Sequence, residues 1–411
     1  MASLRSLLAR ERVNAFGAWV VVAALAVAGS QFLRASEPDW TALTLVLVAA
    51  AVLVPLVERD PSVTVPGELL ALVAVPVVVR AFGVLPSVTP FFAIAGVALL
   101  VAVLLDAYTS LSMTPRFAVV FVVVVTMAFA GAWAVGTYAA DVVVGTSFVP
   151  GQQELMWDLV GATAAGVAAG VVFDVYFEYS DRVSRLRRAT RDDAASAAAG
   201  GELPGDGRQH VLAVRAMQAV LVAATALAVL ELNATLAVNT AVPLAITLLP
   251  AALRREYEYT MDTGLVVWVT AASTLHALGA VGLYEWFGWY DSVTHALSAS
   301  LVAGVGYAVA RAVERHSRAV AFNRGFRATF VVLFVLAVGV GWELLEFASG
   351  GLASAVGGEP VLAQYSTADI VNDLVFNAVG AVVVAAGSSA HFEDVAALAT
   401  DWVGVAVRSG E

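Results

Sequence analysis

The chain has 411 residues, of which 60% are hydrophobic and only 13% are charged, and its mean hydropathy is +0.84. About a quarter of the residues of a soluble domain are charged, so this composition excludes an ordinary soluble protein and indicates a membrane protein. The formal net charge of −11 argues against nucleic-acid binding, and the lack of cysteine excludes disulfides, thiolate metal sites and cysteine nucleophiles.

Every basic residue in the sequence is an arginine. An acidic chain without lysine is typical of a halophilic protein, whose exposed segments need negative charge to stay soluble in salt. A biased base composition would also replace lysine by arginine, so both explanations remain open.

Long apolar segments of about 17 to 22 residues, without the alternation of a barrel strand, predict membrane-spanning helices. The sequence therefore predicts an all-α, polytopic, multi-pass protein of the cell membrane, with the lipid bilayer as its partner and about 12 transmembrane helices. The predicted spans are 15–33, 41–58, 66–84, 88–107, 117–137, 154–178, 211–231, 237–253, 263–284, 292–313, 328–349 and 368–388.

The first span follows the basic stretch "MASLRSLLARER" and precedes "AVAGS", a conceivable cleavage site. Because many further spans follow it, we expect a signal anchor more than a removed signal peptide. With the amino terminus in the cytoplasm, every arginine except Arg34 and Arg80 falls on the cytoplasmic side. The positive-inside rule therefore predicts that both termini are cytoplasmic.

One long polar connection, "SDRVSRLRRATRDDAASAAAGGELPGDGRQ", divides the spans and predicts a cytoplasmic linker. The expected organisation is a first transmembrane half, a linker, a second transmembrane half and a cytoplasmic tail, at residues 1–178, 179–210, 211–388 and 389–411.

The two halves contain three similar segments in the same order. "FGVLPSVTP" aligns with "FGWYDSVTH", "GAWAVGTY" with "VGWELLEF", and "QELMWDLVGATAAG" with "ADIVNDLVFNAVGA". We therefore expect two parallel six-helix repeats, the first of them degenerate. Most ionisable groups of the second half have no counterpart in the first, but Glu154 and Asp158 align with Asp369 and Asp373. Whether they retain a site is left open.

Three predicted helices of the second half carry ionisable groups spaced about one helical turn apart. In the predicted topology these groups all reach the extracytoplasmic end of the bundle. The residues are Asp291 and His295 in "DSVTH", Glu343 and Glu346 in "WELLEF", and Asp369, Asp373 and Asn377 in "DIVNDLVFN".

Carboxylates in a bilayer are costly, and the expected outer loops of this half offer no arginine to neutralise them. The cluster could bind a divalent metal ion, bind a cationic or proton-donating ligand, or lie partly protonated in a wet cavity. Oxygen ligands with an imidazole suit a divalent ion, whose bound water could attack an ester or phosphoryl centre. The expected metal ligands are Asp291, His295, Glu343, Glu346, Asp369 and Asp373, with Asp373, Glu343 and His295 as catalytic groups.

Structural roles are the alternative for each group. Asp291 and Asp369 could cap their helices, and Glu343 and Glu346 could be solvated at a helix end. Asn377 and His276, the latter in "STLHALGA", could support the ligands by hydrogen bonds or could only pack between helices. Trp286, Trp289, Tyr290 and Tyr365 are expected to form an aromatic belt at the membrane surface.

The segments "YDSVTHALSA", "WELLEF" and "DIVNDLVFNAVGA", with "LHALGA" upstream, resemble the YjdF-like inner-membrane proteins and, more distantly, VanZ-like proteins. The resemblance covers residues 263–388. It implies a polytopic membrane fold but no activity, because the YjdF-like family has no established function. The association of VanZ-like proteins with glycopeptide-antibiotic resistance is not carried over.

Three functions therefore stay open. The chain could be a metal-dependent hydrolase or transferase for lipid or envelope substrates, a proton- or cation-coupled transporter, or a membrane scaffold. The substrate, a small molecule or a lipid, is not specified. The sequence shows no interrupted helix near the acidic cluster, which argues against a transporter.

Overall fold

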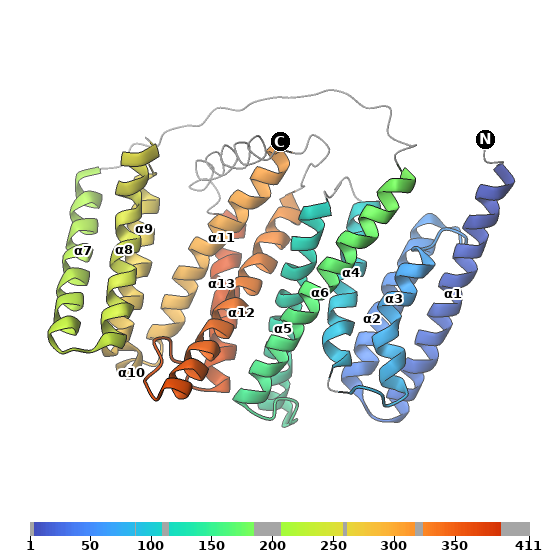
Figure 1. Cartoon of the computed structure of the whole chain (residues 1–411), viewed down its shortest axis with the longest axis horizontal. Coiled ribbons are helices and arrows are strands. Elements are labelled where there is room, and N and C mark those ends of the chain that lie inside the picture. Colours follow the sequence, from blue (N-terminus) through green and yellow to red (C-terminus); the bar gives the residue numbers. More distant parts are fainter. Residues whose placement is uncertain are drawn as a thin grey trace. The chain divides into compact units, whose positions relative to one another are not determined.

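The structure, a computed structural model, describes residues 4–86, 88–108, 115–184, 207–257, 261–316 and 324–387. In these residues it is helical, without a strand (Figure 1). Most of the expected linker 179–210 and the whole expected tail 389–411 lie outside them. The elements are α1 Leu4–Arg34, α2 Pro38–Glu58, α3 Gly67–Ala81, α4 Thr89–Tyr108, α5 Pro115–Val144, α6 Gln152–Ser184, α7 Gly207–Leu230, α8 Ala234–Tyr257, α9 Thr263–Leu278, η1 Gly279–Leu283, α10 Tyr284–Trp286, α11 Tyr290–His316, α12 Arg324–Val356 and α13 Thr367–Gly387.

Within the described residues, 10 helices are long and apolar enough to cross a membrane. Helix α3 has 15 residues, and the apolar part of α4, Thr89–Leu104, is also shorter than a usual span. These helices confirm the predicted all-α, polytopic fold. The chain is a multi-pass membrane protein.

The chain divides into two compact units. One comprises Met1–Ala130 and Trp157–Arg191, and the other comprises Gly131–Met156 and Asp192–Glu411. The division runs through α5 and α6, so the end of α5 and the start of α6 pack with the second unit. The expected halves and the expected repeat remain predictions.

In the second unit, α7, α8 and α9 pack on one another, as do α11, α12 and α13 (Figure 1). Small residues allow the closest approach, between α11 and α13. A side chain at Gly380 would meet the carbonyl oxygen of Ala296 and the methyl group of Ala299. This contact lies two turns beyond Asp373 in α13 and directly after His295 in α11, so it holds the two helices together close to the predicted site residues.

Helix α9 does not continue regularly to its end. The π-helical turn η1 follows Leu278, and within it Gly282 has φ 141°, which only glycine adopts easily. The ring of Tyr284 occupies the space that a side chain at Gly279 would need. The expectation that no helix near the acidic cluster is interrupted was therefore wrong, because these two glycines allow a break that hydropathy does not reveal.

The α11–α13 contact predicts that Gly380→Ala destabilises the protein. The added methyl group would press on the backbone of α11, and such overpacking costs about 1–3 kcal/mol. Thermal unfolding in detergent measures the effect. Gly350→Ala in α12 is the matched control, since a methyl group there meets no atom within 4 Å. Equal unfolding temperatures for the two variants would contradict the proposed tight contact.

Candidate metal centre

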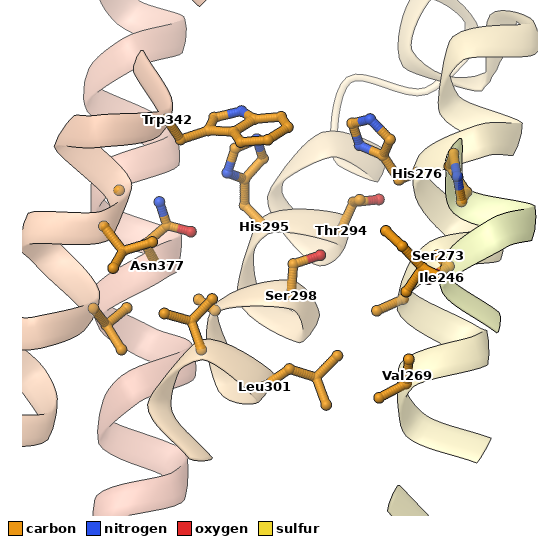
Figure 2. Close-up of a pocket in the computed structure, with 17 residues that line it drawn as sticks. Ile246, Val269, Ser273, His276, Thr294, His295, Ser298, Leu301, Trp342 and Asn377 are labelled. Carbon is orange, nitrogen blue, oxygen red and sulfur yellow. The ribbon is translucent and has the colours of Figure 1, made fainter. Parts of the chain in front are cut away.

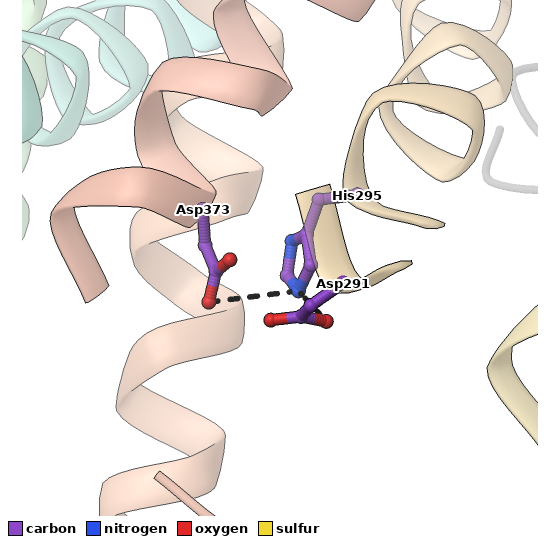
Figure 3. A group of neighbouring side chains, drawn as sticks. All are labelled: Asp291, His295 and Asp373. Atoms are coloured by element: carbon purple, nitrogen blue, oxygen red, sulfur yellow. Dashed lines mark ion pairs between the residues drawn. The ribbon is translucent and has the colours of Figure 1, made fainter. Parts of the chain in front are cut away.

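Two helices bring three of the predicted ligands together. Asp291 and His295 lie one turn apart at the start of α11, and Asp373 faces them from α13 (Figure 3). His295 Nε2 is 3.6 Å from Asp291 Oδ1 and 3.6 Å from Asp373 Oδ2. One ligand atom from each residue lies within 4.8 Å of the others. The arrangement is the size of a single-ion site.

The geometry and the chemistry of this group fit a divalent ion. Two ligands about 2.1 Å from an ion in a tetrahedral site lie about 3.4 Å apart, close to the observed separations. Asp373 is only 3% exposed, and its Oδ1 has no hydrogen-bond partner among the described residues. A carboxylate buried without a partner is costly, so a cation here would offset a large desolvation penalty.

Arginine does not neutralise this group in the described structure. Arg311 of α11 and Arg327 of α12 instead pair with Glu314, at 2.9 and 3.0 Å. These ion pairs join the end of α11 to the start of α12. They therefore lie far along the two helices from Asp291 and Glu343.

Glu343 is fully buried, with 0% of its surface exposed. Its Oε2 accepts a hydrogen bond of 3.0 Å from Gln364 Nε2, and its Oε1 has no partner among the described residues. Gln364, in the loop between α12 and α13, is bound in turn by Gln152 at 3.1 Å. Helix α12 continues to Val356, beyond the predicted end at 349, so the alternative of a solvated helix end is wrong for Glu343.

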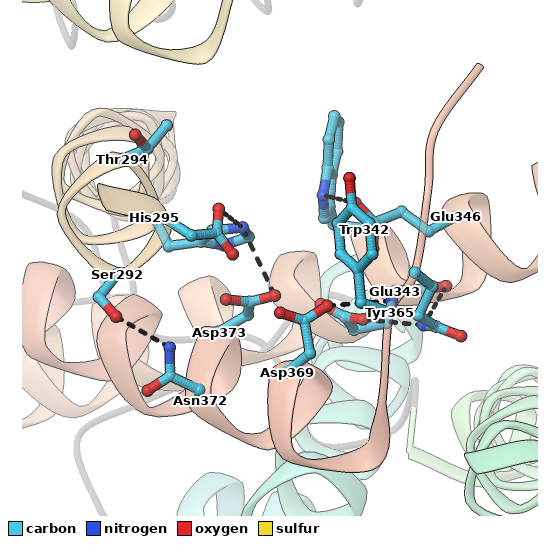
Figure 4. A network of polar contacts seen from close by, with 12 residues as sticks. Ser292, Thr294, His295, Trp342, Glu343, Glu346, Tyr365, Asp369, Asn372 and Asp373 are labelled. Atoms are coloured by element: carbon cyan, nitrogen blue, oxygen red, sulfur yellow. Dashed lines mark hydrogen bonds and ion pairs between the residues drawn. The ribbon is translucent and has the colours of Figure 1, made fainter. Parts of the chain in front are cut away.

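Glu346 and Asp369 have other partners (Figure 4). Glu346 accepts a hydrogen bond of 2.9 Å from Trp342 Nε1. Asp369 Oδ2 accepts from the backbone N–H of Tyr365 at 3.2 Å, while its own N–H donates to Ser366 Oγ at 3.1 Å. This pattern resembles a capping box, so Asp369 takes the capping role considered above.

The carboxylates of Glu343, Glu346 and Asp369 lie around the group formed by Asp291, His295 and Asp373. Asp373 interacts electrostatically with Asp291, Glu343, Asp369 and Glu346. Figure 4 shows Glu343 and Glu346 of α12 near Asp369 and Asp373 of α13. The structure thus brings Asp291, His295 and Asp373 together as one possible ligand set. Glu343, Glu346 and Asp369 lie around it with hydrogen bonds of their own.

His276 belongs to an aromatic group near the end of α9. Its Nδ1 lies 3.1 Å from the hydroxyl of Tyr284, and its ring meets Trp342 edge to face at 5.9 Å. Tyr290 is buried and donates to the carbonyl oxygen of Leu275 at 3.0 Å, so its expected place in the aromatic belt was wrong. Trp286, Trp289 and Tyr365 are exposed, as a belt requires. The break after Leu278 brings Tyr284 back to His276, which the helical spacing alone did not indicate.

An apolar cavity of about 330 Å³ borders this site (Figure 2). His276, His295, Trp342 and Asn377 line it together with apolar residues of α8, α9, α11 and α12. His295 therefore has the two carboxylates on its Nε2 side and also contributes to the wall of the cavity.

Two family models match parts of the chain. The family described as a predicted membrane protein, DUF2238, matches residues 213–394, which include every residue of the candidate metal centre. A domain of unknown function, DUF8268, matches residues 2–64. No curated protein and no solved structure is significantly similar to the chain. The chain is thus similar to a family of membrane proteins, and the resemblance to YjdF-like and VanZ-like proteins remains a prediction.

The contact between Gln364 and Glu343 predicts a stability effect. Gln364→Ala would leave the buried carboxyl group of Glu343 without its partner, at a cost of about 1–3 kcal/mol. In a Glu343→Leu background the same substitution should cost much less, since no carboxyl group remains to be satisfied. Thermal unfolding of the four proteins in detergent measures this coupling. An equal cost in both backgrounds would show that Gln364 acts through other contacts.

Proposed function

We propose that this protein is a metal-dependent membrane hydrolase or transferase acting on a lipid or envelope substrate. A divalent ion would be held by Asp291, His295 and Asp373. The observation that carries the proposal is the convergence of three ligand atoms within 4.8 Å, one of them from a carboxylate that keeps a buried oxygen without a partner. The apolar cavity beside His295 supports a substrate with a hydrocarbon part.

The ligand set favours an ion that accepts both nitrogen and oxygen donors, such as Zn²⁺ or Mn²⁺. Two carboxylates and a neutral imidazole together neutralise a charge of +2. Three protein ligands leave at least one coordination position for water or for a substrate oxygen. An open position of this kind separates catalytic sites from closed structural ones.

An ion held by Asp291, His295 and Asp373 would supply a bound water that gives up a proton more readily than bulk water does. Glu343, whose Oε1 is unpartnered, would accept that proton. The resulting hydroxide would add to the carbonyl carbon or phosphorus atom of the substrate. The bond to the leaving oxygen would then break, and that oxygen would take the proton from Glu343. In a transferase an alcohol would replace the water.

Metal content tests the ligand assignment. Purified protein equilibrated with Zn²⁺ or Mn²⁺ should retain one ion per chain, measured by elemental analysis. Asp373→Asn and His295→Ala should each weaken binding on the order of 100-fold or more, because each removes one of three ligands. Asp262→Asn is the control, since Asp262 caps the opposite end of α9 through the N–H of Leu265. A metal-free wild-type protein would refute the proposal.

A proton- or cation-coupled transporter is the second candidate. The break in α9 at Gly279–Leu283 favours it, because transporters commonly place binding sites at interrupted helices. The fully buried Glu343 is also a suitable proton carrier within a membrane. In this candidate the same residues would bind and release protons or cations instead of activating water.

Glu343→Gln discriminates between the two candidates. For the enzyme, the variant should still bind the ion but should lose about 10²- to 10⁴-fold in hydrolysis of lipid esters, because the proton acceptor is gone. For the transporter, an ion or pH gradient should drive the uptake of protons or cations into vesicles that contain the wild-type protein. Vesicles that contain Glu343→Gln should show no such uptake. Hydrolysis unchanged in the variant would remove Glu343 from the proposed reaction.

A further inference from the structure

The cavity beside His295 lies entirely within membrane-spanning helices of the second unit. Its walls come from α8, α9, α11, α12 and α13, all of which contain candidate membrane spans. A ligand in this cavity would therefore contact mainly apolar side chains of these helices.

The aromatic and most of the polar groups that line the cavity lie toward one end of it (Figure 2). Three helices repeat the same arrangement, in which a polar or aromatic residue is separated by seven positions from an apolar residue. Seven residues of helix correspond to about 10 Å. The pairs are His276 and Val269 on α9, His295 and Val302 on α11, and Trp342 and Val335 on α12.

The intermediate levels contain little polarity. Ser273 and Ser298 lie between the two ends, while Ile246, Ala272 and Leu301 complete the apolar wall. Asp291 precedes His295 by one turn, so the carboxylates lie beyond the polar end of the cavity, toward the beginning of α11. From the beginning of α11 toward its middle, the surroundings therefore change from carboxylates to imidazole and then to hydrocarbon side chains.

We infer that this cavity holds the acyl chain of a membrane lipid ester, with the ester group at His295 beside the metal centre. The inference rests on the proposed function and names the substrate class of the same site. The chain would run from the end of the bundle toward its middle, as it does in the bilayer itself. Headgroup atoms would lie on the carboxylate side, where the ion can polarise the ester.

The volume of the cavity limits its occupant. At about 330 Å³ the cavity is within the usual size range of sites for small molecules and single lipid chains. Water alone is a poor occupant, because apolar walls offer it too few hydrogen-bond partners. A single hydrocarbon chain satisfies both limits.

Binding of n-alkylphosphonates tests the inference. These probes carry a metal-binding anionic head that cannot be hydrolysed, and a series from butyl to dodecyl varies the chain alone. With Zn²⁺ present, affinity for the wild-type protein should rise up to about fourfold per methylene and level off once the chain spans the cavity. Calorimetry on detergent-solubilised full-length protein gives the affinities.

Cavity-filling variants separate specific binding from simple partitioning. Val302→Phe and Val269→Phe should shorten the chain length at which affinity levels off, while zinc binding is unchanged. Val305→Phe is the matched control, because Val305 lies on α11 as Val302 does, is 51% exposed and does not line the cavity. Either cavity-filling variant suffices if the other fails to fold.

The outcomes distinguish this inference from the proposed function. Affinity that rises without levelling off, and equally in all variants, would overturn the acyl-chain site even if zinc binds. A chain-length limit that shortens in Val302→Phe but needs no metal would support the acyl-chain site. That second result would overturn the metal centre instead.

Discussion

The second unit depends on how an apolar bundle accommodates buried carboxyl groups without an arginine partner in the described residues. Asp373 and Glu343 are almost completely enclosed, and each keeps one oxygen without a hydrogen bond in the described structure. Groups of this kind cost several kcal/mol unless something compensates for the lost water. The close packing of α11 against α13, which Gly380 permits, nevertheless holds Asp373 next to His295. The fold therefore maintains an arrangement that packing alone would disfavour, which is typical of a functional site.

The contacts of the six predicted metal ligands divide them into groups with different expected roles. Asp291, His295 and Asp373 contact one another, whereas Asp369 caps α13 and Glu346 is bound by Trp342. Glu343 occupies an intermediate position, with one oxygen held by Gln364 and one free. This division gives each group a different expected role, since ligands need converging atoms and a proton acceptor needs a free one.

Sequence reasoning predicted the helices and the pairing of Asp291 with His295 one turn apart, because hydropathy and helical spacing are local properties. It could not predict the role of Gln364, which lies in a loop with no periodic pattern, nor the burial of Tyr290. The break after Leu278 was also missed, although Gly279 and Gly282 were visible in the sequence. Glycine is common in membrane helices, so its presence alone does not reveal a positive φ. The cavity depends on how α9 meets α11 and α12, which no single segment encodes.

The turn at Gly279–Leu283 amounts to extra chain accommodated within one helix. In a regular helix each residue turns the chain by about 100°, so removing one residue would redirect everything that follows by that angle. The hydroxyl of Tyr284 would then no longer point at His276. The length of this segment, and not only its two glycines, is therefore under constraint: apart from Gly279 and Gly282, homologues that keep His276 and Tyr284 together should tolerate substitutions here more readily than insertions or deletions.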